Sequence, residues 1–348
     1  MKELEKNICR SQNSKFPFVI YRKPHSEEII GVFQKDNRLH YSKDLSGNGF
    51  IFAPFDDKNN TIVIPYSKAR ILKCKSEIPV LSKNKKEVVN AEDVKLNHVE
   101  LVKKGIAYIK NSKLDKVVLS RKEEIEVVDF NILDTFNELC DFYPNAFVYL
   151  WSHPISGIWM GASPERLLTV KSNKFKIMAL ASTQKFNGVL RVEWGEKERE
   201  EHQIVIDYIA DKMQDYNIST SDTYTVKAGG LLHLRADLEG EITDSTKSIK
   251  PLIQVLHPTP AVCGLPKDES KLFILENEQY NREYYTGFLG ELSDREADLF
   301  VNLRCMKIDL VKSMATLFVG GGITKDSIPE KEWLETVAKT NVMKKVLL

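Results

Sequence analysis

Short runs of apolar residues, each bounded by turn-forming residues, dominate the first quarter of the chain. Clusters of Asn, Asp, Lys, Gly and Ser separate these runs and indicate loops. A polar, lysine-rich stretch at residues 75–92 follows and predicts a surface connection. We expect this quarter to form one flank of a large sheet. Its predicted strands are residues 16–21, 29–33, 49–55 and 61–65.

Strand and helix patterns follow each other irregularly in the rest of the chain. Helical periodicity marks residues 93–111, 130–143, 195–209, 248–256, 272–285 and the end of the chain from Pro329. Strand patterns mark residues 116–121, 146–151, 157–160, 166–170, 174–180, 223–226, 231–235, 288–291, 299–304 and 315–320. Because strands do not alternate regularly with helices, the pattern favours an α+β domain with many antiparallel strands over a doubly wound fold. We find no repeats and no linker, and we predict one domain over residues 1–348.

The helix predicted at residues 195–209 carries carboxylates where a helix usually carries core residues. Glu198, Glu201, Val205 and Ile209 fall on one stripe at helical spacing. The apolar part of this stripe must face the interior. We therefore expect both glutamates to point into a cleft.

A second pair, Glu332 and Glu335, lies near the other end of the chain. If the two pairs converge, they provide an oxygen-rich site for a hard divalent cation. For either pair alone, the preferred interpretation is solvated glutamates that the dipole favours in the first turn of a helix.

Two further side chains are candidates for acid–base chemistry. Lys116 begins a predicted strand, where lysines are commonly exposed, but a buried lysine that loses its proton is a general base. The turn at Gly161–Glu165 aims Glu165 from a sheet edge, unless this glutamate simply pairs with Arg166. The bare triple glycine Gly320–Gly322 is a weak phosphate signal, although it lets backbone N–H groups approach an anion.

The composition excludes several classes of protein. The 348 residues are 42% hydrophobic and 28% charged, with a net charge of +1, which argues against a nucleic-acid-binding protein. No apolar run has the length of a membrane span, and the first residues lack the apolar region of a secretory signal. We expect a cytoplasmic protein whose cysteines are reduced thiols. These are scattered, at Cys9, Cys74, Cys140, Cys263 and Cys305.

Nine short stretches, in this order and spacing, resemble the chorismate-utilising enzyme family, and most closely its isochorismate synthases. They cover about residues 95–345, so residues 93–348 are the motif-bearing core and residues 1–92 the variable N-terminal part. The stretches are Lys116–Arg121, Gly161–Glu165, Ala179–Thr183, Glu196–His202, Leu231–Leu234, His257–Gly264, Asn302–Cys305, Gly320–Ile323 and Glu332–Thr336.

The resemblance implies two large packed antiparallel sheets with flanking helices and a magnesium site in a cleft. By their motif positions, Glu201 and Glu335 would coordinate Mg²⁺, and Glu198 and Glu332 would act on metal-bound water or as outer ligands. The resemblance places further residues in contact with the substrate, chorismate: Thr183, His233, Arg304, Gly320 and Lys339.

The resemblance also implies a reaction. Lys116, as the neutral amine, would take a proton from a water that adds at C2 of chorismate. Glu165, protonated, would give a proton to the departing C4 hydroxyl. The product would be isochorismate, made for menaquinone or siderophore synthesis by a monomer that binds neither nucleic acid nor membrane.

Comparison within the family favours water as the nucleophile. Ammonia-using members such as anthranilate synthase usually carry glutamine in place of Lys116, and aminodeoxychorismate synthases usually carry lysine in place of Ala181. Salicylate synthases share the base lysine, so they stay an alternative, although the loop at His257–Gly264 looks more like isochorismate synthase. A non-catalytic chorismate-binding protein is the other alternative. Ser182 departs from the usual glycine, and its side chain could crowd the ring pocket.

Overall fold

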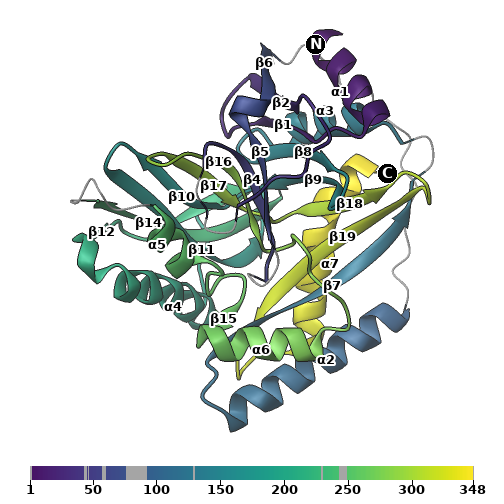
Figure 1. The fold of residues 1–348 in the computed structure, drawn as a ribbon. Helices are drawn as coiled ribbons and strands as arrows, with labels where there is room; N and C mark the ends of the chain where they lie inside the picture. Colours follow the sequence, from purple (N-terminus) through teal and green to yellow (C-terminus); the bar gives the residue numbers. More distant parts are fainter. Residues whose placement is uncertain are drawn as a thin grey trace.

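The fold consists of two large antiparallel sheets packed face to face, with helices on their outer surfaces (Figure 1). The computed structural model describes residues 2–42, 45, 47–56, 60–75, 92–127, 130–228, 230–242 and 249–347. This confirms the predicted α+β architecture. Within these residues, no helix combines the length and apolar character needed to cross a membrane.

One sheet has nine strands in the described part of the chain. In spatial order they are β15 (Gly264–Leu265), β7 (Lys116–Glu126), β19 (Met314–Ile323), β18 (Cys305–Asp309), β9 (Gly157–Ser163), β8 (Phe147–His153), β1 (Phe18–Arg22), β2 (Glu28–Gln34) and β6 (Ala69–Lys75). We call it the first sheet.

The second sheet has ten strands among the described residues. In order they are β12 (Ser219–Thr220), β14 (Leu231–Glu241), β11 (Lys174–Lys185), β10 (Arg166–Lys171), β17 (Ala297–Val301), β16 (Phe288–Leu292), β4 (Gly49–Ala53), β5 (Thr61–Pro65) and β3 (Tyr41–Ser42), while β13 (Tyr224–Ala228) pairs with β14. Strands from the first quarter of the chain thus extend both sheets. The boundary at residue 92 stays a prediction, and residues 76–91 of the predicted connection lie outside the described residues.

Aromatic side chains from both sheets form the core between them. Phe147 of the first sheet stacks on Phe300 of the second, with ring centroids 4.2 Å apart. Phe52 of the second sheet packs against Trp151 of the first at 5.1 Å. Such rings remove large apolar areas from water and so fix how the sheets are packed.

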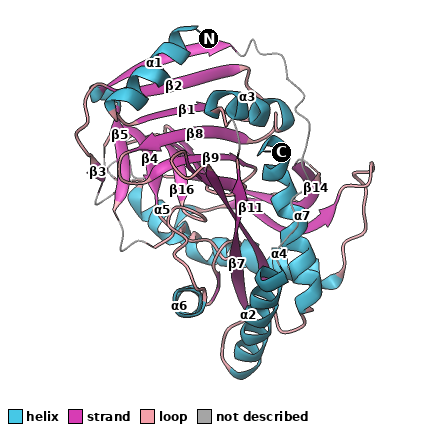
Figure 2. Ribbon diagram, turned by 90° about the vertical axis from the view of Figure 1, so that its right-hand side faces the viewer, coloured by secondary structure: helices cyan, strands magenta, loops and turns pink. Residues whose placement is uncertain are grey.

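Helices cover the outer faces of the sheets (Figure 2). Helices α1 and α3 pack on β2 and β8, α4 packs on β11, and α7 packs on β19 beside α2. The helices are α1 (Lys2–Ser14), α2 (Glu92–Asn111), α3 (Ile132–Phe142), α4 (Glu196–Lys212), α5 (Lys250–Leu256), α6 (Lys267–Asn277) and α7 (Pro329–Leu347).

Three expectations from the sequence were wrong in detail. Residues 2–14 form α1, whereas only strands and loops were expected there. The helix expected at residues 272–285 is α6, which ends at Asn277 because the backbone becomes extended at Glu278. The Glu278 carboxylate pairs with Arg282 and accepts from the Ser120 backbone and hydroxyl. The strand expected at residues 299–304 ends at β17, and the chain then enters β18 of the other sheet.

Candidate active site

Two crossovers between the sheets carry Glu165 and Arg304. The chain passes from β9 to β10 at Glu165 and from β17 to β18 at residues 302–304. Backbone hydrogen bonds join these crossovers, because Ala162 donates to the Arg304 carbonyl and Val301 to the Glu165 carbonyl, both at 3.0 Å. Arg304 has φ +48°, a left-handed conformation that is uncommon outside glycine. Both side chains line one cavity, which we call the catalytic cavity.

Glu165 is in the protonation state that a general acid needs. Its side chain is buried, and burial raises its pKa to about 8, although Lys116 and Arg304 act in the opposite direction. The carboxyl group therefore keeps its proton at neutral pH. A protonated acid at the wall of a cavity can donate that proton to a leaving hydroxyl.

Lys116, at the start of β7, is fully buried rather than exposed. Its Nζ lies 2.8 Å from Glu201 Oε1, so the two side chains form an ion pair. A Cβ on Gly322 would collide with the Glu201 carboxylate and would lie 2.9 Å from Lys116 Cε. The third residue of the triple glycine thus has to be small because this ion pair fills the space beside it.

Carboxylates from α4 and α7 meet beside the triple glycine of β19. Glu332 Oε2 and Glu335 Oε1 each lie 3.8 Å from the position that a Cβ on Gly321 would take, and Glu201 lies beside Gly322. The structure therefore brings together three of the four glutamates that were expected to converge.

Glu198 is the fourth, and its carboxylate lies apart. Its Oε2 is 2.5 Å from the position that a Cβ on Gly195 would take, at the N-terminus of its own helix, and it does not line the catalytic cavity. The helix dipole favours a carboxylate there. Val205 and Ile209, lower on the same stripe, are buried as predicted. A role for Glu198 at a metal stays a prediction.

Each of the three converging carboxylates is paired with a lysine. Besides the pair that Glu201 forms with Lys116, the pairs are Glu332 with Lys197 at 2.7 Å and Glu335 with Lys339 at 2.6 Å. These pairs join α4 to β7, α7 to α4, and one turn of α7 to the next.

The lysines also set the ionisation of the carboxylates. Burial alone raises the pKa of Glu201, but Lys116, Lys339 and Lys197 outweigh it and hold that pKa below its usual value. Burial dominates at Glu332 and raises its pKa, with Lys197 opposing. The carboxylate of Glu201 is therefore charged at neutral pH.

The donor set suits a hard cation such as Mg²⁺. The three carboxylates would supply oxygen ligands, and Mg²⁺ typically takes one or two carboxylates and keeps several waters. As placed, no group of three or more His, Cys, Asp or Glu side chains among the described residues lies close enough together to hold an ion. The assignment of Glu201 and Glu335 as ligands, with Glu332 outside them, stays a prediction.

His233 on β14 presents an unpartnered acceptor to the catalytic cavity. Its Nδ1 lies 2.7 Å from the Ser182 carbonyl, so this nitrogen carries the proton and donates it. Nε2 is then the acceptor, and it is buried with no partner among the described residues. Burial, helped by Arg304, lowers the pKa of His233 to about 3, so the ring is neutral. Thr183 Oγ1 lies 3.4 Å from Nδ1, and its side chain also lines the cavity.

Ser182 shows why glycine suits its position. It has φ +60°, at an irregularity where the pairing of β11 with β14 shifts between Ala181 and Gln184. Glycine adopts this left-handed conformation without a steric cost. The serine lines the cavity, but its Oγ donates to the Glu198 carbonyl at 2.6 Å, so the hydroxyl is held by α4.

The three residues expected to hold substrate carboxylates line the same cavity. Lys339 Nζ donates to the Gly320 carbonyl at 2.9 Å, beside its ion pair with Glu335. The Arg304 guanidinium lines the same cavity and makes no ion pair with any described residue. A cation in this position is available for an anionic ligand.

Sequence reasoning missed several residues of the site. Tyr285 and Thr286 line the catalytic cavity, but they had been assigned to a helix and its end. Lys197 was overlooked, although it stands four residues before Glu201, a spacing at which oppositely charged side chains on a helix are neighbours.

Comparison with known proteins identifies the family. Residues 54–348 match the family described as chorismate binding enzyme. The chain belongs to this family. The resemblance inferred from the nine stretches is thus confirmed, and the catalytic cavity described above belongs to a chorismate-binding enzyme.

Relatives in this family carry different activities. The vibriobactin-specific isochorismate synthase of Vibrio cholerae is 31% identical to this chain over 260 residues. The match covers 69% of this chain and 65% of the Vibrio protein, so this chain spans just under two thirds of the length of that relative. Anthranilate synthase component 1 of Thermococcus kodakarensis is 27% identical over 311 residues, 85% of this chain and 68% of that protein. The crystal structure of a Bacillus anthracis protein, DhbC, described as a putative 2,3-dihydroxybenzoate-specific isochorismate synthase, matches over 99% of both chains at TM-score 0.80 and 22% identity, which shows a shared fold.

Proposed function

We propose that this chorismate-binding enzyme is an isochorismate synthase. It would convert chorismate to isochorismate in the presence of Mg²⁺, by adding water at C2 and losing the C4 hydroxyl. The observation that carries the proposal is that Glu165 lines the catalytic cavity with a pKa of about 8, which keeps it protonated, while Glu201 of the same cavity pairs with the buried Lys116. Relatives named isochorismate synthase support it.

The two residues would work on opposite ends of one substitution. Lys116 takes a proton from water as the water oxygen bonds to C2. The ring electrons shift, the C4–O bond breaks, and Glu165 gives its proton to the departing hydroxyl, which leaves as water. One water enters and one leaves, so the product is an isomer of the substrate. This mechanism needs a protonated acid and a neutral base at the same pH, in a site that excludes other water.

Glu201 links the base to the predicted metal site. It pairs with Lys116 in this structure, and its carboxylate also lies beside Gly322, where it would hold the cation. A base must be a neutral amine. If Glu201 held a cation, Lys116 would lose this partner, and its neutral amine would be available to take a proton from water.

Other residues would bind and orient the substrate. A bound magnesium ion would neutralise and anchor the ring carboxylate. Arg304 and Lys339 would hold the second carboxylate with charge-assisted hydrogen bonds. His233 Nε2, an acceptor without a partner among the described residues, would receive a hydrogen bond from a substrate hydroxyl, with Thr183 beside it.

Product analysis tests the proposal against its alternatives. The protein is mixed with chorismate and Mg²⁺, with and without ammonium, and the products are separated by chromatography. We expect isochorismate in both mixtures. Salicylate with pyruvate would identify a salicylate synthase, and anthranilate formed only with ammonium would identify an anthranilate synthase. Binding of chorismate without turnover would identify a non-catalytic binder.

The setting of the enzyme is also a proposal. All five cysteines are free, which fits a reducing compartment such as the cytoplasm. We further propose a monomer that binds neither nucleic acid nor membrane, and light scattering after gel filtration tests the oligomeric state. Neighbouring genes would distinguish menaquinone from siderophore synthesis.

A further inference from the structure

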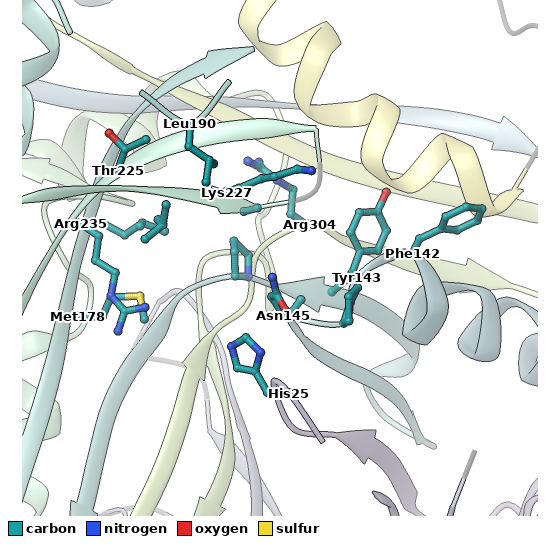
Figure 3. A pocket seen from close by; sticks show the side chains of 17 residues that line it. His25, Phe142, Tyr143, Asn145, Met178, Leu190, Thr225, Lys227, Arg235 and Arg304 are labelled. Carbon is teal, nitrogen blue, oxygen red and sulfur yellow. The ribbon is translucent and has the colours of Figure 1, made fainter. Parts of the chain in front are cut away.

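A second cavity of about 530 Å³ adjoins the catalytic cavity (Figure 3). We call it the outer cavity. It lies between the turn after α3, the crossover after β9 and strands β11, β13 and β14. Pro164, Leu180 and Arg304 line both cavities, so these three residues form the wall between them. No step of the proposed reaction uses the rest of the outer cavity.

The charged side chains that line the outer cavity are all basic. Lys227, Arg235 and Arg304 are among its described lining residues, and no Asp or Glu is. Asp237 neutralises Arg235 by accepting two hydrogen bonds, at 2.8 and 3.0 Å. A concave surface lined by one sign of charge attracts ligands of the opposite sign.

Lys227 and Arg304 supply the positive charge that remains. Lys227 Nζ lies 4.0 Å from the centre of the Phe186 ring, and neither cation makes an ion pair with a described residue. Lys227 comes from β13, and Arg304 stands at the wall to the catalytic cavity. Of the two cations without an ion pair, Lys227 thus lies in the outer cavity and Arg304 lies where it meets the catalytic cavity.

The remaining walls are largely apolar. Met178, Leu180 and Leu190 line the outer cavity with Ala146 and Ala162. Apolar walls with a few fixed cations suit a small carbocyclic acid, whose ring contacts the walls while its carboxylates contact the cations. Chorismate is such a molecule and carries two carboxylates.

We propose that the outer cavity is the vestibule through which the dicarboxylate substrate reaches the catalytic cavity. A carboxylate first contacts Lys227 and then transfers to Arg304, as the ring passes Pro164 and Leu180. The proposal rests on chorismate being the substrate. It makes Lys227 a capture residue that takes no part in the chemical step.

A bulky substitution tests whether ligand passes through the outer cavity. Asn145 is exposed on the turn before β8 and lines this cavity (Figure 3). Asn145→Phe is compared with Asn37→Phe, at an exposed turn outside it. Both are made in the Glu165→Gln protein, so that chorismate binds with Mg²⁺ but is not consumed. Stopped-flow fluorescence then gives the association and dissociation rate constants, with Trp333, beside Glu332, as a reporter.

An obstructed route slows entry and exit together. We expect Asn145→Phe to lower both rate constants by a similar factor, roughly fivefold or more, and to leave the dissociation constant unchanged. The control Asn37→Phe should change neither. Structural damage to the catalytic cavity would instead change the dissociation constant. Unchanged rate constants in Asn145→Phe would overturn the proposal.

Removing the capture charge gives an independent test. Lys227→Gln should lower the association rate constant roughly threefold at low salt, and the difference should vanish at high salt, where screening removes the attraction. Lys104→Gln, at an exposed position on α2, should have no effect. Equal rate constants for Lys227→Gln and the parent protein would overturn the role of Lys227. If the unsubstituted protein bound no chorismate, the proposed function and the vestibule would both be wrong, whereas tight binding with unaltered kinetics would reject the vestibule alone.

Discussion

Replacing Glu165 with glutamine should abolish turnover and also stabilise the protein at alkaline pH. Glutamine keeps the size of the side chain but can neither ionise nor act as the acid. In the unsubstituted protein this buried carboxyl group has a pKa of about 8, raised chiefly by burial from an ordinary 4.5. Because the folded state holds the proton more tightly than the unfolded state, stability falls as the pH rises from about 4.5 to about 8.

The size of this effect follows from the two pKa values. Between 4.5 and about 8, at 1.36 kcal/mol for each pH unit, the folded protein loses about 5 kcal/mol of its free energy of unfolding. Relaxation and water penetration reduce such penalties, commonly to several kcal/mol. The glutamine variant has no proton to lose, so its stability relative to the parent should increase by several kcal/mol between pH 5 and pH 9.

Urea unfolding at pH 5, 7 and 9, without metal or substrate, measures this difference. The control is Glu100→Gln on α2, where the carboxylate is exposed and its replacement should give a small difference at every pH. Chromatography of the reaction products should show no isochorismate from Glu165→Gln. For the parent, kcat/KM should fall to half near pH 8, because this ratio follows the loss of the proton from Glu165 in the free enzyme. A stability difference that is the same at pH 5 and pH 9 would refute a buried acid of raised pKa.

Three further predictions concern the rest of the site. Lys116→Gln should abolish the hydration of chorismate, because the base is lost, and it should leave the circular dichroism spectrum unchanged. Full activity of this variant would show that another group takes the proton. Glu335→Gln should weaken Mg²⁺ binding at least tenfold in calorimetry, because loss of a metal ligand should cost no less than loss of a residue that supports one. The control Glu330→Gln, at an exposed position, should leave the affinity unchanged. An unchanged affinity in Glu335→Gln would show that Glu335 is not a metal ligand. Ser182→Ala should lower the free energy of unfolding by about 1 kcal/mol through loss of the hydrogen bond to α4. Ser182→Gly should be nearly neutral in urea unfolding, because relief of the left-handed backbone offsets that loss; equal destabilisation by both would contradict the conformational argument.

The sequence predicted elements well where local pattern decides them. The helix expected at residues 93–111 is α2, within one residue at its start, because its apolar period is sustained over many turns. Helix α1 was missed because only two of its buried residues, Leu4 and Ile8, are apolar. The other two, Asn7 and Ser11, are polar and interrupt the apolar pattern. The end of β17 could not be predicted, because residues 302–304 cross between sheets whose pairing is set by distant strands.

The candidate site was predictable to a similar extent. Spacing placed Glu198 and Glu201 on one stripe of a helix, but it could not show that the first carboxylate turns back over Gly195 while the second reaches Lys116. The pairing of Lys197 with Glu332 joins residues far apart in the sequence, so no local pattern contains it. Periodicity indicates which face of a helix a side chain lies on, and contacts between elements decide where its charged end goes.

The lysine partners give a physical reason for cation and substrate to bind together. The three ion pairs between carboxylates and lysines in the site carry no net charge. Under the proposed function, Mg²⁺ brings two positive charges and chorismate two negative ones. Either ligand alone would change the charge of a buried site by two units, which is costly, whereas both together leave its net charge unchanged. The carboxylates could then turn to the cation and the lysines to the anion, so the groups that form these ion pairs are also the groups that would receive the two ligands.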